Sequence, residues 1–444
     1  MEGNILGTKK ISKLFLKFCI PAIVSMVIAG IQPIIDGIFL GNFVGTNSMA
    51  SVNIVQPFMQ LIIGFSMIVS VGALSFIGRS LGEGKKEESQ NIFKTATIVL
   101  FSASILMLLF GKIYSVQIAS FLGANEVLLK DCAIYINTIS TFSPMMCIMF
   151  LFGFISRVLN NPELYLKATI SSLITNIILD YLFIKELGLG IGGAAFATGL
   201  SFSVALIVVI IPMFNKDNIL NIYVGKFDKS LIIPMLYNGS SEGVVSVAAA
   251  ITAFVFNMTF MNIAGEQGVA AFTTINYMGQ FVTLIMFGIS DGITPIVSYN
   301  YGTKNKQRLD EALGLAIKVN VSIGIILFLI LFAFGRPLVS IFANDNQAII
   351  DLATSGSKLY ALAFLVCGFN IIYSGYFTAI GDARASIVIA LSRGIIFIVT
   401  GIYLLPMIIG ISGVWLTIPF AELITYMIGI TLMKSNNKNY QMVA

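Results

Sequence analysis

The sequence predicts an all-α integral membrane protein of twelve transmembrane helices, in two six-helix lobes related by a pseudo-two-fold axis along the membrane normal. Three observations lead to this class. Of the 444 residues, 57% are apolar and only 11% are charged, which is about half the charged share of a soluble globular chain. Apolar runs long enough to cross a bilayer recur along the chain. The second half of the sequence also repeats part of the first half at a nearly constant offset.

Twelve apolar runs reach the roughly 20 residues that a helix needs to span the hydrocarbon core. The polar segment 215–231 separates the sixth run from the seventh. We therefore expect an N-terminal lobe at residues 1–214, a cytoplasmic linker at 215–231 and a C-terminal lobe at 232–444. The predicted spans lie approximately at residues 15–41, 49–78, 92–111, 131–155, 164–187, 192–214, 232–264, 269–300, 311–334, 352–378, 385–408 and 412–433.

The basic residues are distributed unevenly between the predicted loops. If the N-terminus is cytoplasmic, 21 of the 26 Lys and Arg lie in or next to cytoplasmic segments. Short cytoplasmic loops of membrane proteins carry such an excess of Lys and Arg. We therefore expect a multi-pass membrane protein with both termini in the cytoplasm. As its location we expect the cytoplasmic membrane of a bacterium or archaeon. The net charge of +5 belongs to this topology and does not indicate a nucleic-acid partner.

The internal repeat is a parallel one. A single offset aligns Gly72 with Gly292 and Gly82 with Gly302, and it maps helix onto helix. Because each half has an even number of spans, both halves enter the membrane from the same side. Transporters built from such repeats place the substrate site between the two halves.

Several chemistries are excluded by what the sequence lacks. It contains no histidine, so a Ser-His-Asp triad, a histidine metal site and a histidine proton relay are impossible. Its four cysteines lie in apolar segments without CxxC spacing, which is typical of buried free thiols. No phosphate-binding Gly-Lys loop is present. We expect no enzymatic activity, no catalytic residues and no cofactor.

Two carboxylates fall inside predicted spans at the same depth. Asp36 and Asp180 each lie five residues before the outer end of their helix, and Thr198 lies six residues into a helix that starts outside. Asn176 lies one turn before Asp180 on the same helix face. Two neighbouring carboxylates in a medium of low dielectric constant favour a proton or a hard cation such as Na⁺ between them. The alternative is a hydrogen-bonded pair of carboxyl groups that never exchanges an ion.

The repeat favours the ion-binding interpretation. When the halves are aligned at an offset of 220 to 221 residues, Asp36 falls opposite Phe256 and Asp180 opposite Gly401. A pair of acids needed only for folding would have reason to occur in both lobes. Their presence in one lobe points to a function assigned to that lobe.

Other polar residues within the spans allow two interpretations each. Glu242 could face a central cavity and meet a cationic substrate, or make a structural hydrogen bond. Asp291 opens the sequence DGITP, whose glycine and proline are expected to break the helix, so its carboxylate either caps a helix or contacts substrate. Pro21 could be a hinge or a static kink. For Glu422 and Arg393 we predict an ion pair between neighbouring helices.

Four segments of the sequence resemble the multidrug and toxic compound extrusion (MATE) family of secondary transporters, and the likeness extends over essentially the whole chain. The segments are PIIDGIFLGNFVG in the first span, TNIILDYLFI in the fifth, GIGGAAFATGLS in the sixth and DGITPIVSYNYG in the eighth. In members with this first-lobe pattern, the matching polar residues form a site linked to protons or sodium. The resemblance implies this coupling role for Asp36, Asn176, Asp180 and Thr198, with Tyr135 beside them, and a bending role for Pro21.

We therefore predict a secondary active multidrug antiporter that exports organic, cationic amphiphilic compounds in exchange for H⁺ or Na⁺ by alternating access. It would act as a monomer, with drugs or other organic cations and membrane lipids as its partners and no nucleic acid. The alternative is a flippase for lipid-linked precursors with a similar architecture, which a basic cavity would favour. Acids within the predicted spans outnumber bases, which favours cationic cargo. The sequence leaves the choice between H⁺ and Na⁺ open.

Overall fold

The computed structural model describes residues 5–342 and 347–443, and all regular elements in these ranges are helical. They are α1 (Ile5–Thr8), α2 (Ile11–Phe43), α3 (Thr46–Gly82), α4 (Lys86–Ile113), α5 (Ser115–Phe121), α6 (Leu129–Thr141), α7 (Ser143–Val158), α8 (Pro162–Asp180), η1 (Tyr181–Glu186), α9 (Gly190–Ile210), η2 (Ile211–Phe214), η3 (Lys229–Leu231), α10 (Ile232–Gly302), α11 (Lys306–Phe342), α12 (Gln347–Ala361), α13 (Phe364–Ile380), α14 (Ala383–Leu391), η4 (Ser392–Ile396), α15 (Phe397–Ile409) and α16 (Ile411–Val443).

These helices account for the twelve predicted spans. Over the described residues, nine helices are long and apolar enough to cross a membrane alone. Two bent pairs, α6 with α7 and α12 with α13, each form one further span with a bend of 51°. The long helix α10 contains two spans, 232–264 and 266–302, because Gly265 interrupts it with φ 61° and ψ −153°. Glycine adopts this left-handed φ without steric cost, since it has no Cβ.

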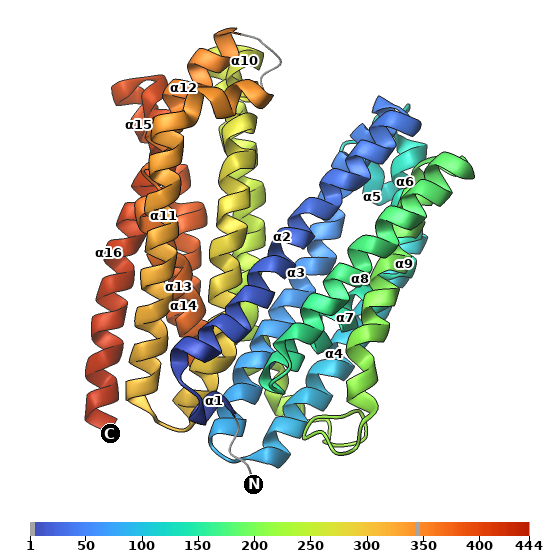
Figure 1. Cartoon of the computed structure of the whole chain (residues 1–444). Helices are drawn as coiled ribbons and strands as arrows, with labels where there is room; N and C mark the ends of the chain where they lie inside the picture. The colour runs from blue at the N-terminus through green and yellow to red at the C-terminus, as the bar shows by residue number, and fades with distance from the viewer. Residues whose placement is uncertain (1–4, 343–346, 444) are drawn as a thin grey trace.

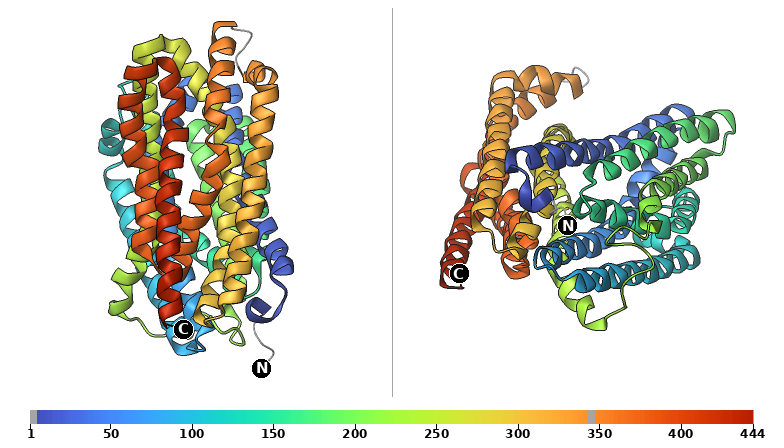
Figure 2. Two further views of the ribbon diagram at one scale, coloured as in Figure 1. Left: turned by 90° about the vertical axis from the view of Figure 1, so that its left-hand side faces the viewer. Right: turned by 60° about the horizontal axis from the view of Figure 1, so that its bottom comes forward.

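The helices form two lobes that meet at one end and diverge toward the other (Figure 1). Helices α2 to α9 make one lobe and α10 to α16 the other, and residues 215–228 join them without any helix. The end at which the lobes meet carries α1 and the C-terminal end of α16. The same two groups of helices are seen when the lower end of the molecule is turned forward (Figure 2).

The hydrophobic core follows this arrangement. One cluster of buried side chains crosses between the lobes near their contact, where Phe18 of α2 belongs with Ile293 of α10 and Phe377 of α13. A second cluster, around Trp415, lies in the second lobe alone, and a small third one, around Leu40, lies in the first lobe. The lobes therefore share a core at one end only.

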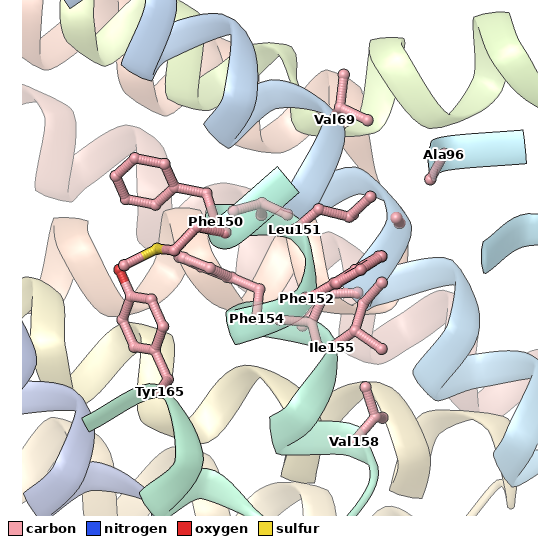
Figure 3. Close-up of a cluster of buried hydrophobic side chains, with 14 of the residues drawn as sticks. Val69, Ala96, Phe150, Leu151, Phe152, Phe154, Ile155, Val158 and Tyr165 are labelled. Carbon is pink, nitrogen blue, oxygen red and sulfur yellow. The ribbon is translucent and has the colours of Figure 1, made fainter. Parts of the chain in front are cut away.

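Helix α7 forms the centre of the first lobe. Its side chains from Met146 to Val158 are all buried, and Figure 3 shows several of them, with Val69 and Ala96 on one side of the cluster and Tyr165 on the other. The Phe152 ring lies 5.6 Å from that of Phe93 on α4. Interiors packed this closely move as rigid units, so α7 holds its polar end residue, Arg157, in a fixed place.

Glycines allow the two lobes to touch backbone to backbone. A Cβ on Gly239 of α10 would overlap the carbonyl oxygen of Ile68 on α3, and a Cβ on Gly72 of α3 would overlap that of Met235 on α10. The contact is reciprocal, with one glycine supplied by each lobe. Any larger residue at Gly239 or Gly72 would force the lobes apart at this point.

Candidate functional site

Helices α2, α8 and α9 bring the predicted polar cluster together inside the first lobe. The Thr198 hydroxyl donates a hydrogen bond to Oδ2 of Asp36 at 3.3 Å. Asp180 and Asn176 also lie against the Asp36 carboxylate. Each of these four side chains is at most 8% exposed. Directly after Asp180 the helix widens into the π-helical η1, a deviation that occurs frequently at functional sites.

Most of the polar atoms at this site have no partner within the protein. Oδ1 of Asp36, both carboxylate oxygens of Asp180 and both amide atoms of Asn176 are buried without a hydrogen bond. Leaving a buried carboxylate unpaired is costly. The donor set, carboxylate, amide and hydroxyl oxygens, is the type that binds a proton or a hard cation. Among the described residues, no group of three or more His, Cys, Asp or Glu could hold a metal ion, so any ion here meets two carboxylates.

Further polar side chains line the same region. Tyr135 of α6 is 4% exposed and lies beside Thr198, near both aspartates. One helical turn away, Gln32 and Ser172 both donate hydrogen bonds to Oγ of Ser201, at 3.4 and 3.2 Å. This second polar layer was not predicted, because single serines and glutamines within apolar spans are too common to stand out. The layer extends the site across α2, α8 and α9.

The lower part of α2 carries Pro21 and packs against the second lobe. The helix is continuous from Ile11 to Phe43 with Pro21 and Pro33 inside it, so the role of Pro21 as a hinge stays a prediction. Two residues earlier, the Cys19 thiol donates across the lobe contact to the carbonyl oxygen of Ile289 at 3.7 Å. Cys19, like the other three cysteines, is a buried free thiol.

The predicted helix break at DGITP is wrong, and so is the cap-like role for Asp291. Helix α10 runs without interruption from 266 to 302, with Pro295 inside it. Pro295 lacks the N–H that would bond the carbonyl of Asp291 one turn earlier. Arg157 of the first lobe donates from Nη1 to that carbonyl oxygen at 3.4 Å and lies 3.7 Å from Oδ2 of Asp291. A partner from the other lobe thus satisfies the freed carbonyl, which keeps the helix intact.

Arg157 is the main polar residue that the sequence did not reveal. The predicted span ended at residue 155, which placed Arg157 in a cytoplasmic loop. In the structure its side chain is 1% exposed and its guanidinium lies over the rings of Phe154 and Tyr165, at 4.3 and 5.0 Å from their centroids. The protein therefore buries one more basic residue than the sequence suggested.

Glu242 and Asp291 border the same small cavity, which the second lobe forms together with Val71 of the first lobe. The cavity has about 20 Å³ of free volume, which is room for about one water molecule. Among the described residues, no Lys or Arg pairs with Glu242 and no hydrogen bond reaches its carboxylate. Of the two interpretations of Glu242, the structural hydrogen bond is thus not seen. The residues that line the cavity are Val71, Glu242, Val245, Phe287, Ser290, Asp291, Thr294, Ile371, Ser374, Gly375, Thr378 and Arg393.

The predicted ion pair within the second lobe is confirmed. Nη2 of Arg393 on η4 lies 2.7 Å from Oε1 of Glu422 on α16. Asn370 of α13 donates to the other carboxylate oxygen, Oε2, at 2.6 Å. The charge of Arg393 is therefore neutralised by its own lobe, although its side chain borders the cavity with Glu242.

A protein-family model described as MatE matches two segments of the chain, residues 21–182 and 243–404. The chain belongs to the MATE family. The two matched segments are related by nearly the same offset that aligns Gly72 with Gly292, so the internal repeat is confirmed. The chain is accordingly a multi-pass membrane transporter and not an enzyme.

Individual members of the MATE family resemble the whole chain. The multidrug export protein MepA of Staphylococcus aureus (strain bovine RF122 / ET3-1) is 24% identical over 412 residues, which cover 92% of this chain and 90% of that protein. A crystal structure of MATE in the bent conformation superposes with a TM-score of 0.93 at 21% identity and covers 100% of this chain and 99% of its own. A MOP superfamily transporter from Pyrococcus furiosus gives a TM-score of 0.91 at 21% identity, with 99% of each chain covered. These structures share the fold of this MATE chain.

Proposed function

We propose that this MATE transporter is a secondary active exporter that exchanges organic cations for H⁺ or Na⁺. The observation that carries the proposal is the buried pair Asp36 and Asp180, three of whose four carboxylate oxygens lack a hydrogen-bond partner within the protein. A proton or a monovalent cation would supply the missing partner. The name of the staphylococcal relative, a multidrug export protein, supports drug-like compounds as cargo.

Ion binding would act through the packing of α2, α8 and α9. Each uncompensated charge at a helix centre costs about 2.5–3.5 kcal/mol on insertion scales, so occupied and empty sites favour different helix arrangements. An ion can shift the balance between two conformations only by its difference in affinity for them. In this arrangement the lobes meet at the end that carries α1 and the end of α16. With both termini in the cytoplasm, as the loop charges favour, this is the outward-facing state.

The same proposal covers the organisation and setting of the chain. We assign the lobes to residues 1–214 and 232–444, with 215–231 as a cytoplasmic linker, in a monomer of the bacterial or archaeal cytoplasmic membrane. Lipids would surround the lobes, and no nucleic acid, metal cofactor or catalytic group would be needed.

Cationic cargo is favoured over anionic lipid-linked cargo by the ion pairs of Arg157 and Arg393. In the present arrangement Arg157 pairs with Asp291 and Arg393 with Glu422, so neither offers a free positive charge to a phosphate group. Glu242, in contrast, has no basic partner among the described residues. The charges around the Glu242 cavity therefore suit a cation better than the anionic lipid-linked precursor that a flippase would carry.

We expect purified protein in liposomes to export tetraphenylphosphonium, a simple organic cation, when an ion gradient is imposed at clamped membrane potential. Separate proton and sodium gradients identify the coupling ion, because only the coupled ion drives accumulation against the cation gradient. Liposomes without protein give the leak rate. Transport at the leak rate under both gradients and under their combination would overturn the proposal.

A further inference from the structure

We propose that Arg157 competes with the cargo cation for Asp291, so that the contact between the lobes sets the affinity for cargo. With the lobes in contact, Arg157 occupies the carboxylate and cargo binds weakly. When the lobes part at this end, Asp291 is released and cargo binds tightly. This inference rests on the proposed export of organic cations and assigns Arg157 a role in releasing them.

The ion pair can exist only while the lobes touch at this end. Arg157 belongs to α7 of the first lobe and Asp291 to α10 of the second. The rings of Phe154 and Tyr165, which flank the guanidinium, are both in the first lobe. When the lobes separate, Arg157 therefore moves with α7 and leaves Asp291 behind.

The geometry of the Arg157–Asp291 ion pair allows it to break easily. Its Nη1 to Oδ2 distance of 3.7 Å is long for a charge-assisted hydrogen bond, and Nη2 of Arg157 is buried without a partner. The aromatic rings around the guanidinium support the cation in its own lobe after the pair has broken. Separation of the lobes therefore does not require Arg157 to lose all of its stabilising contacts.

Asp291 faces Arg157 on one side and the cavity with Glu242 on the other. Arg393 also borders this cavity but is neutralised by Glu422. While Arg157 holds Asp291, the cavity presents one unpaired carboxylate, that of Glu242. After Arg157 leaves, it presents two, and the attraction for a monovalent cation rises accordingly.

This order of affinities suits export. Cargo must bind on the cytoplasmic side, where its concentration is low, and dissociate on the outside. The cavity has about 20 Å³ of free volume in the present arrangement, too little for a drug molecule, whose pockets measure about 300–1,000 Å³. The outward-facing arrangement thus combines an occupied Asp291 with a contracted site.

The test needs the protein locked in the present arrangement. Gly64 of α3 and Ser246 of α10 face each other across the lobe contact, and a Cβ on Gly64 would lie 3.6 Å from that of Ser246. This spacing suits a disulfide. The double variant Gly64→Cys/Ser246→Cys can therefore be oxidised to hold the lobes together and reduced to free them.

We expect tetraphenylphosphonium to bind the reduced double variant more tightly than the oxidised one, by the 5- to 150-fold that is usual for roughly 1–3 kcal/mol of coupling. Adding Arg157→Gln should raise affinity in the oxidised form and narrow the difference between the two forms, and the contracted cavity should account for the difference that remains. Arg157→Lys, which keeps the charge, should retain a difference. Asp291→Asn should bind weakly in both forms. Equilibrium dialysis of the folded proteins, checked by thermal unfolding, measures all four.

Arg79→Gln is the matched control. Arg79 is another largely buried arginine at the lobe contact, where it donates to the carbonyl oxygen of Ile380 at 3.3 Å, but it does not touch Asp291. It should leave the redox dependence of binding intact. Equal binding in both redox forms, or an unchanged difference after Arg157→Gln, would overturn the role of Arg157 while leaving cation export standing. Absence of binding in both forms would overturn the cationic cargo and this role together.

Discussion

Asp36→Asn and Asp180→Asn are each expected to reduce gradient-driven export of tetraphenylphosphonium to the leak rate. Either change keeps the size of the side chain and removes one of the two carboxylates that can bind the coupling ion. With one carboxylate left, the site loses part of the negative charge that binds the coupling ion. The ion gradient then no longer drives the change between the two arrangements of the lobes. Export from liposomes under an imposed proton or sodium gradient is the measurement.

The matched control for these variants is Asp351→Asn. Asp351 lies on the exposed surface of α12, where it pairs with Arg336 at 2.8 Å, and such surface pairs contribute about 0–1 kcal/mol. Its loss should leave export unchanged. If both site variants export at the rate of the unmodified protein, the polar cluster of the first lobe is structural and the coupling assignment is wrong.

Gly239→Leu is expected to prevent the lobes from meeting and to stop transport. The leucine side chain would start at a Cβ that overlaps the carbonyl oxygen of Ile68, and a helix backbone in this position cannot yield without moving α3. The population should shift toward the state that is open at the end carrying α1. Distances between spin labels on the turn after α3 and the turn after α10 should lengthen.

Gly314→Leu provides the control for that experiment. Gly314 lies on α11, where a Cβ would meet no atom within 4 Å, so the same substitution adds bulk without a clash. Label distances and export should both match the unmodified protein. Normal export by Gly239→Leu would show that the reciprocal glycine contact is not needed for closure.

The spans and the ion site could be predicted because both depend on signals that run along the chain. The length of an apolar run sets the span, and the regular rise of a helix places each side chain at a depth. That is how Asp36, Asp180 and Thr198 could be matched before any contact was known. The short surface helix α5 gave no such signal, since seven residues cannot cross a bilayer.

The sequence misplaced Arg157 and predicted a false helix break at Asp291, and in both cases a contact between the lobes determines the structure. Arg157 follows the predicted end of a span by two residues, and a charge in that place is normally solvated. Asp291 is followed by glycine and proline, which normally end a helix. Each supplies what the other lacks, a carbonyl acceptor on one side and a guanidinium donor on the other, and no local pattern in the sequence can show that pairing.

The buried thiol of Cys19 is a native chemical probe of the opening between the lobes. It is 1% exposed and lies against Ile289 of the opposite lobe, so a water-soluble maleimide can reach it only after the lobes have parted. The rate at which the thiol is alkylated therefore reports how often the lobes separate at the end that carries α1. No engineered label is needed. Adding cargo or coupling ion during labelling would then report, in real time, which of them speeds the turnover between the two forms.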